Sequence, residues 1–242
     1  MQARHTAAVL WTGGKDSCLA LHEAAGLGYK VSSLVTFVPP DAAFRAHPVP
    51  FLQKQAEALG LVYRTFEVRP PYRQGYQSAF RLMQEELGMS HIITGDIGEV
   101  GGNPNWVSSI AKELGMTAVT PLWERGRQSL MESILEQQFR VCFSYVRSPW
   151  LGPEWVGTEL TEASLGELKR VSAETGMDLC GEQGEYHTLV LDGPVFRDSL
   201  HLDHSSIRTE PGSSFLEIHK LLSHRKNQDG GAVHSQLLQS TY

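Results

Sequence analysis

The stretch Thr12-Gly13-Gly14-Lys15-Asp16-Ser17 decides the fold of this 242-residue chain. An apolar run, residues 7–11, comes directly before it, and apolar residues recur with helical spacing after it. A strand, a glycine turn and the start of a helix therefore follow one another along the chain. This order predicts the first strand–turn–helix unit of an α/β protein.

This loop combines several groups that attract an anion. Gly13 and Gly14 let successive backbone N–H groups face one point, and the helix that starts at Ser17 adds unpaired N–H groups and a positive dipole end. Lys15 supplies a positive charge, Ser17 a hydroxyl, and Asp16 a carboxylate that suits Mg²⁺. The spacing differs from that of the Walker loop. We expect the whole loop to bind the phosphates of a nucleotide; the alternative is an ordinary turn before a helix.

Composition and charge limit the class of protein. Hydrophobic residues make up 41% of the chain, enough for a packed core, and the length allows one α/β domain with a smaller appendage. The net charge is −6 and the pI about 5.9, so nucleic acid is not an expected partner. The sequence leaves the oligomeric state open, with a homodimer among the options.

The cysteines and the apolar stretches predict a cytoplasmic protein. Cys18, Cys142 and Cys180 are odd in number and far apart, which suits a reducing compartment better than a disulfide framework. No apolar stretch reaches the ~20 residues of a membrane span, and the first residues lack a signal-peptide core. We therefore expect no membrane partner.

The first half of the chain alternates strand-like and helix-like segments. This alternation predicts a doubly wound parallel sheet, a Rossmann-like α/β domain over residues 1–125. Ligands of such sheets bind at the carboxyl ends of the strands. Gly95 and Asp96 follow a short apolar strand, so we expect them to bind a ligand at that edge, where Asp96 suits Mg²⁺ or a substrate group. The alternative for Asp96 is a turn or cap residue. The predicted strands are 31–38, 61–68, 91–94 and 118–119, and the predicted helices are 51–59, 75–87 and 106–114.

The second half predicts a smaller α+β domain over residues 126–204. Amphipathic helices are expected at 128–139 and 160–175, with a strand at 140–146 between them. The polar residues 205–242 are expected to form a tail with one short amphipathic helix, from Phe215 to Leu222.

The segment from Gly181 to Thr188 is the second place where the sequence concentrates chemistry. If a strand begins at Glu185, then Glu185 and His187 share one of its faces and can share a proton or orient a nucleophile. We expect both to be catalytic; the alternative is a solvated strand edge. Metal binding by Glu182, Glu185 and His187 ranks low, because no second histidine or cysteine lies at ligand spacing.

Three further residues of that segment, Glu182, Gly184 and Thr188, are expected to contact the substrate, since flanking glycines let backbone approach a ligand closely. His47, in a proline-bounded loop, is a candidate to reach the phosphate site, though a structural role is the more common one for a lone histidine. The glycine-rich stretch from Gly98 to Asn105 is either a lid or an idle surface loop.

Three blocks of the sequence resemble those of the diphthine–ammonia ligase family, within the superfamily of ATP pyrophosphatases that carry a pyrophosphate loop. The blocks are Thr12–Ser17, Thr94–Ile97 with Pro121–Trp123 downstream, and Cys180–Val190 with Asp192–Phe196. The resemblance implies an adenine nucleotide α-hydrolase-like domain and a smaller acceptor domain. It also implies cleavage of ATP to AMP and pyrophosphate with Mg²⁺, an acyl-adenylate, and its capture by ammonia. Lys15 would then be catalytic, and the loop Thr12–Ser17 would bind ATP together with Gly95 and Asp96.

The chain departs from the family pattern at two positions. Members that act on diphthine in a modified elongation factor usually carry glutamate where His187 stands, and many carry glutamate where this chain has Ser108. The histidine form is similar to bacterial relatives that are suspected of amidating a small molecule, a corrinoid in cobalamin salvage. The acceptor is thus a carboxylate on a protein or on a small molecule, and ammonia is free or supplied by a partner.

Two rival functions follow from the same residues. A tRNA sulfur transferase of the same superfamily is disfavoured, because such enzymes usually have paired cysteines and basic surfaces. A module that binds ATP without cleaving it is disfavoured by the Glu185 and His187 block.

Overall fold

The computed structural model describes residues 6–38, 40, 46–99 and 105–226. These residues contain a sheet of five parallel strands, β1 (Thr6–Leu10), β2 (Lys30–Val38), β3 (Val62–Glu67), β4 (His91–Ile93) and β5 (Thr117–Val119). Their order in the sheet is β3-β2-β1-β4-β5. The chain therefore winds outward from β1 to one edge and then returns to wind toward the other, which confirms the predicted doubly wound sheet.

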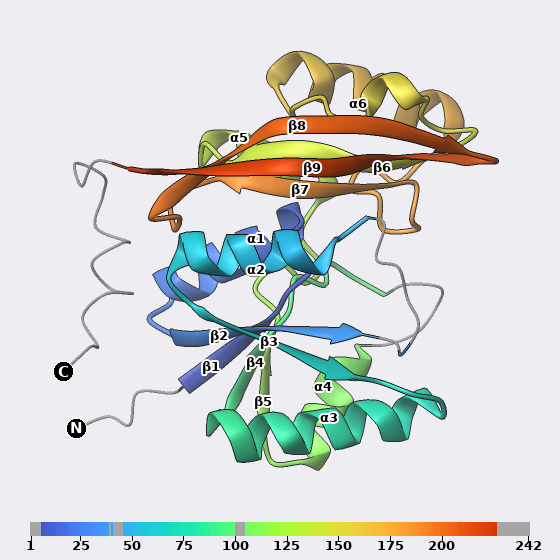
Figure 1. Cartoon of the computed structure of the whole chain (residues 1–242). Coiled ribbons are helices and arrows are strands. Elements are labelled where there is room, and N and C mark those ends of the chain that lie inside the picture. The colour runs from blue at the N-terminus through green and yellow to red at the C-terminus, as the bar shows by residue number, and fades with distance from the viewer. Residues whose placement is uncertain (1–5, 39, 41–45, 100–104, 227–242) are drawn as a thin grey trace.

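Helices cover both faces of this sheet (Figure 1). Helices α1 (Lys15–Gly26) and α2 (Val49–Leu59) lie on one face, and α3 (Tyr72–Leu87) and α4 (Trp106–Glu113) lie on the other. β1 is apolar after Thr6 because it is covered from both sides, and Ala7, Ala8 and Val9 have no exposed surface. α2 and α3 end at Gly60 and Gly88, both in the left-handed conformation that favours glycine after a helix.

The described part of the second half forms a sheet of four antiparallel strands. They are β6 (Arg140–Arg147), β7 (Tyr186–Asp192), β8 (Asp198–Glu210) and β9 (Ser213–Arg225), in the order β7-β6-β9-β8. Helices α5 (Arg127–Glu136) and α6 (Glu162–Thr175) and a short 3₁₀ turn (Pro153–Trp155) complete it. This arrangement confirms the smaller α+β part.

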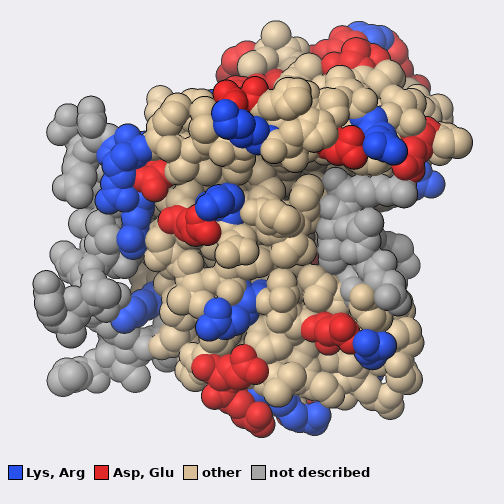
Figure 2. Space-filling model, in the orientation of Figure 1, with Lys and Arg blue, Asp and Glu red and all other residues tan. Residues whose placement is uncertain are grey.

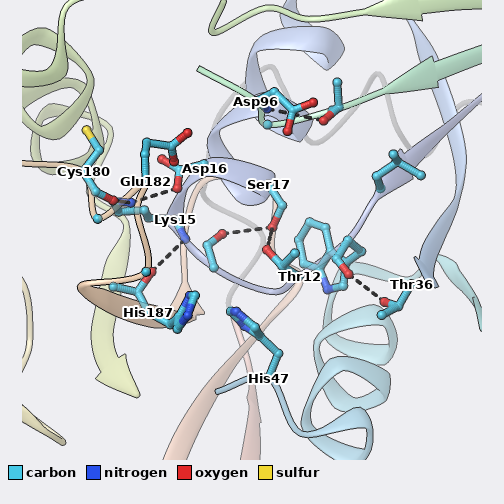
Figure 3. A pocket seen from close by; sticks show the side chains of 18 of the residues that line it. Thr12, Lys15, Asp16, Ser17, Thr36, His47, Asp96, Cys180, Glu182 and His187 are labelled. Atoms are coloured by element: carbon cyan, nitrogen blue, oxygen red, sulfur yellow. Dashed lines mark hydrogen bonds and ion pairs between the residues drawn. The ribbon is translucent and has the colours of Figure 1, made fainter. Parts of the chain in front are cut away.

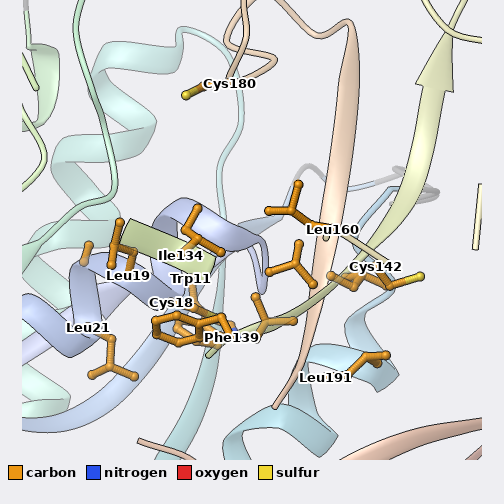
Figure 4. Close-up of a cluster of buried hydrophobic side chains, with 14 of the residues drawn as sticks. Trp11, Cys18, Leu19, Leu21, Ile134, Phe139, Cys142, Leu160, Cys180 and Leu191 are labelled. Carbon is orange, nitrogen blue, oxygen red and sulfur yellow. The ribbon is translucent and has the colours of Figure 1, made fainter. Parts of the chain in front are cut away.

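The two sheets share one hydrophobic core. α1 and α2 lie between the sheets, and α6 covers the outer face of the second sheet (Figure 1). Trp11 and Leu19 of the first part cluster with Ile134, Phe139 and Leu191 of the second (Figure 4). The second sheet is thereby fixed over the helix that follows the glycine loop. This packing closes one side of the ligand edge.

The prediction of a helix from Phe215 to Leu222 is wrong. These residues lie in β9, which pairs with β8 along its length and with β6 at its start. Phe215, Leu216, Ile218 and Leu221 fit a helical spacing, but pairing between strands outweighs that local pattern. The turn at Pro211-Gly212, with Gly212 at φ +82°, was the available signal for a hairpin. Residues 205–225 thus belong to the second sheet rather than to a tail.

The surface carries both signs of charge. Figure 2 shows basic and acidic side chains interspersed over one face of the molecule. Across the described residues, each helix is too short or too polar to cross a membrane.

Candidate functional site

A cavity of about 500 Å³ opens at the carboxyl edge of the parallel sheet. It lies where β1 and β4 end side by side, the point at which the winding of the sheet reverses. Its walls combine the loop Thr12–Ser17, the Thr94–Asp96 segment, and the Cys180–Thr188 segment of the second part (Figure 3). The structure therefore brings the three sequence blocks into one cleft.

The glycine loop is built around two close approaches that exclude side chains. Gly13 has φ +71°, and a Cβ there would lie 2.2 Å from Gln55 Oε1. A Cβ on Gly95 would lie 2.7 Å from the backbone carbon of Asp16. Real Cβ atoms do not approach so closely, so both positions require glycine. Gly95 is therefore a packing partner of the loop, and a direct contact with a nucleotide stays a prediction.

Gln55 of α2 braces the loop from behind. Its Nε2 donates to the carbonyls of Gly13 (2.9 Å) and Val190 (2.7 Å), and its Oε1 accepts from Trp11 Nε1 (3.1 Å). The side chain is fully buried. Sequence reasoning missed this residue, although a glutamine inside the apolar stripe of a predicted helix was a signal for a buried hydrogen-bonding role.

Two hydroxyls line the cleft on the loop itself. Thr12 Oγ1 lies 3.3 Å from Ser17 Oγ, and Ser17 Oγ donates to the Gly14 carbonyl (3.0 Å). Gly14 precedes the first residue of α1 in extended conformation, so the first N–H groups of α1 open toward the cleft. The loop therefore has the donor arrangement that binds phosphate.

Lys15 is buried and is held by two oxygen atoms. Its Nζ lies 2.8 Å from Asp16 Oδ2 and donates to the Cys180 carbonyl at 2.5 Å. Burial by itself lowers the pKa of Lys15, but the charge of Asp16 and the neighbouring Tyr186 and Cys180 outweigh it and raise the pKa. Lys15 thus carries its charge throughout the physiological range.

The second part holds the loop through β7. Thr188 Oγ1 accepts from the backbone N–H of Lys15 (3.1 Å), and the Val190 N–H donates to the Gly13 carbonyl (2.9 Å). Thr188, expected to contact substrate, lines the cleft but uses its hydroxyl to fix the loop.

The structure does not bring Glu185 into the cleft. Its buried carboxylate accepts from the backbone N–H groups of Asp178 (2.9 Å) and Gln183 (2.9 Å) and so shapes the turn between them. The predicted sharing of a proton between Glu185 and His187 therefore has no support in the geometry. His187 does line the cleft, as does His47.

Three carboxylates line the cleft beside Lys15. Burial, and then the charge of Asp16, raise the pKa of Glu182 to about 7. Burial also raises the pKa of Asp96, with a smaller contribution from Asp16. Gly184, at φ +82°, lines the cleft with open space around its Cα. Glu182 therefore titrates near neutral pH, where a carboxylate is useful as a base.

The carboxylates do not by themselves form a metal site. Within the described ranges, no three histidine, cysteine or acidic side chains are placed to hold an ion together. Asp16 Oδ1, however, is buried and has no hydrogen-bond partner among the described residues. Mg²⁺ is commonly held by one or two carboxylates and by the phosphates of its nucleotide, so Asp16 fits such an ion.

Arg127, at the start of α5, joins the two sides of the cleft. Its guanidinium donates to Asp178 (3.1 Å) in the second part and to the Ile97 carbonyl (3.2 Å), next to Asp96. The sequence offered no signal for this contact, because its partners are distant along the chain. The stretch from Gly98 to Asn105 was predicted to be a lid or an idle surface loop. Its residues 100–104 lie outside the described residues.

A phosphate-type loop at the switch point of a doubly wound sheet is the arrangement with which α/β proteins bind nucleotides. Known family models match both parts of the chain. Residues 5–118 match the family model described as the diphthamide synthase N-terminal domain, and residues 126–223 match the diphthamide synthase C-terminal domain. The chain belongs to the diphthine–ammonia ligase family, whose members are ATP-dependent ligases that form an amide.

Similar curated proteins carry the same name. The diphthine–ammonia ligase of Bos taurus is 24% identical over 87% of this chain and 88% of its own length, and that of Homo sapiens is 23% identical with the same coverage. That of Schizosaccharomyces pombe is 26% identical over 80% of this chain and 35% of its own length.

One solved structure is described as a predicted subunit of tRNA methyltransferase from Methanocaldococcus jannaschii. It aligns with a TM-score of 0.45 at 17% identity, over 78% of this chain and 97% of that chain. This degree of likeness supports no conclusion about function.

Proposed function

We propose that this enzyme activates a carboxylate with ATP and transfers the acyl group to ammonia. The carboxylate attacks the α-phosphorus of ATP to give an acyl-adenylate and pyrophosphate. Ammonia then attacks the acyl carbon, and an amide, AMP and a proton result. One observation carries the proposal: the anion-binding loop and the carboxylate of Glu182 line the same cleft, and the pKa of Glu182 is raised to about 7.

The loop is suited to hold the leaving pyrophosphate. Its N–H groups, Ser17 and Thr12 are fixed before any ligand arrives, so they stabilise charge on the leaving group without reorganisation. Phosphate oxygens would compete with the Cys180 carbonyl for the Lys15 ammonium. Asp16 would hold a Mg²⁺, and that ion would supply charge neutralisation for the phosphates when bound. Asp96 would contact the same ligands from the end of β4.

Glu182 is suited to receive the proton that amide formation releases. A base works best when its pKa lies near the working pH, and the pKa of about 7 meets this condition. His187 is a weaker base, because burial and Lys15 lower its pKa to about 4. We therefore assign the base role to Glu182 and a binding role to His187.

The test is ATP–pyrophosphate exchange over a panel of carboxylates, with diphthine-bearing elongation factor and a corrinoid acid as the two acceptor classes. We expect exchange that depends on one carboxylate, and AMP with the amide when ammonium is added. Lys15→Met should slow exchange by about 10²–10³-fold, the cost typical of losing one group that stabilises developing charge.

Lys54→Met is the matched control. Lys54 is exposed on α2, pairs only at the surface with Glu57, and should leave exchange unchanged. Formation of ADP in place of AMP, or equal turnover with and without every carboxylate, would refute the proposal.

A further inference from the structure

Two imidazole rings contact each other at one end of the cleft. His47 comes from the segment just before α2, and His187 is the second residue of β7. Their ring centroids lie 5.0 Å apart with the planes at 73°, an edge-to-face arrangement. Figure 3 shows both rings on one side of the glycine loop, while Asp96, Asp16 and Glu182 lie on the other side. The cleft thus has an acidic end and an imidazole end.

Both rings are mounted on fixed backbone. The Ala46 carbonyl, next to His47, accepts from Ser144 Oγ of β6 (3.0 Å). His187 is paired with Tyr145 of β6 in the sheet, and the phenol ring lies 5.4 Å from the imidazole. The pair therefore joins the two parts of the molecule and is positioned before a ligand binds.

The imidazoles are neutral at pH 7. Burial, then the nearby His187 and Lys15, lower the pKa of His47 to about 3, although the hydrogen bond that His47 donates to the Thr12 backbone raises it. Burial and Lys15 lower the pKa of His187 to about 4, while Asp16 and Glu185 act in the opposite direction.

A neutral imidazole carries one N–H donor, and His47 donates its own to the Thr12 backbone. An anionic oxygen would therefore accept from His187, and from His47 once Nδ1 of that ring is protonated. Nδ1 of His47 is buried and has no hydrogen-bond partner among the described residues. An anion at this point would satisfy that atom, and its charge would favour protonation of the rings.

We propose that His47 and His187 form the subsite that binds the carboxylate of the acceptor. The inference rests on the proposed ligase function. The loop N–H groups and Lys15 serve the phosphates, and the acidic end repels a second anion, so the acceptor carboxylate is directed to the imidazole end. The acidic end then remains for cations and for the attacking ammonia, with Asp16, Asp96 and Glu182 as its carboxylates.

The test follows the C2–H resonances of the histidines by NMR at pH 6.0. At that pH a ring with a pKa of about 4 is roughly 1% protonated, and a rise of one unit makes it roughly 10%. Butyrate is the carboxylate probe, and α,β-methylene ATP with Mg²⁺ is the separate nucleotide arm. We expect butyrate to move the signal of His187 toward the protonated position, and that of His47 less, because its pKa is about 3. The nucleotide alone should have a smaller effect than butyrate.

Variants assign the signals and test the pairing. His47→Asn should reduce the response of His187 to butyrate, and His187→Gln should reduce that of His47. His201 and His224 form a ring pair on β8 and β9, do not line the cleft, and serve as internal controls for folding. His219→Asn, on the same hairpin, is the matched control variant.

A shift caused by the nucleotide and not by butyrate would assign the pair to the nucleotide and overturn the inference, as would no shift with either. These signals report binding without turnover. A failure of the ligase proposal would instead leave the butyrate response in place and remove carboxylate-dependent AMP formation.

Discussion

The replacement Gln55→Leu tests whether the fold of the phosphate loop depends on one buried side chain. Leucine has a similar size and suits a helix, so it keeps the packing of α2 and removes only the hydrogen bonds. Those bonds join Gln55 to Trp11 Nε1 and to the carbonyls of Gly13 and Val190, at 2.7 to 3.1 Å.

The cost follows from which groups lose every partner. The Gly13 carbonyl keeps the Val190 N–H, which donates to it at 2.9 Å. The Trp11 N–H loses its acceptor. The Val190 carbonyl loses Gln55, and it cannot turn to β6, because the N–H and carbonyl of one strand residue point the same way and this N–H points at Gly13. Two buried groups without partners cost about 1–3 kcal/mol each. The leucine recovers part of that by apolar burial, so we expect a loss of about 2–4 kcal/mol.

Urea unfolding followed by tryptophan fluorescence measures this loss, with the midpoint lowered and the slope m unchanged. Carboxylate-dependent pyrophosphate exchange should fall at least tenfold, because Gly13 is no longer fixed. Gln53→Leu is the matched control, because the Gln53 side chain is exposed on the same helix. The free energy of unfolding of this variant should stay within about 0.5 kcal/mol of the parent value. Equal stability of Gln55→Leu and the parent would refute the bracing role.

Three further changes probe the rest of the cleft. Gly95→Ala places a Cβ 2.7 Å from the Asp16 backbone and should lower exchange more than tenfold, whereas Gly126→Ala, with nothing within 4 Å, should leave exchange unchanged. Glu182→Gln should remove the rise of amide formation through about pH 7. The folded pKa of Glu182 is raised from 4.5 to about 7, so its contribution to stability is present below pH 4.5 and is lost by about pH 7. Above pH 7, Glu182→Gln should therefore be more stable than the parent in urea unfolding. Equal stability of the two proteins there would contradict the raised pKa. The folded pKa of His187 is lowered from 6.5 to about 4, so its contribution is present above pH 6.5 and falls as the pH drops toward 4, and His187→Gln should lose less stability than the parent over that range.

Local sequence was enough to predict the loop, the parallel sheet and the ligand edge. Adjacent glycines, a lysine and a helix start have their effect within a few residues, and strand–helix alternation predicts a parallel sheet whatever the details of packing. The same logic placed Gly95 and Asp96 at the end of β4, beside the loop. His187 was also predicted at the site, because the block that contains it is dense in polar groups beside an apolar strand.

The tertiary structure decided what depends on partners far apart in the chain. Phe215–Leu222 forms a strand because β8 and β6 pair with it, although its spacing alone suits a helix. Glu185 lies outside the cleft lining because its carboxylate accepts from two backbone N–H groups. His47 and His187, 140 positions apart by their numbers, meet because α2 and β7 pack on the same loop. Hydrogen-bond partners and burial set the role of a polar side chain, and both are properties of the folded chain.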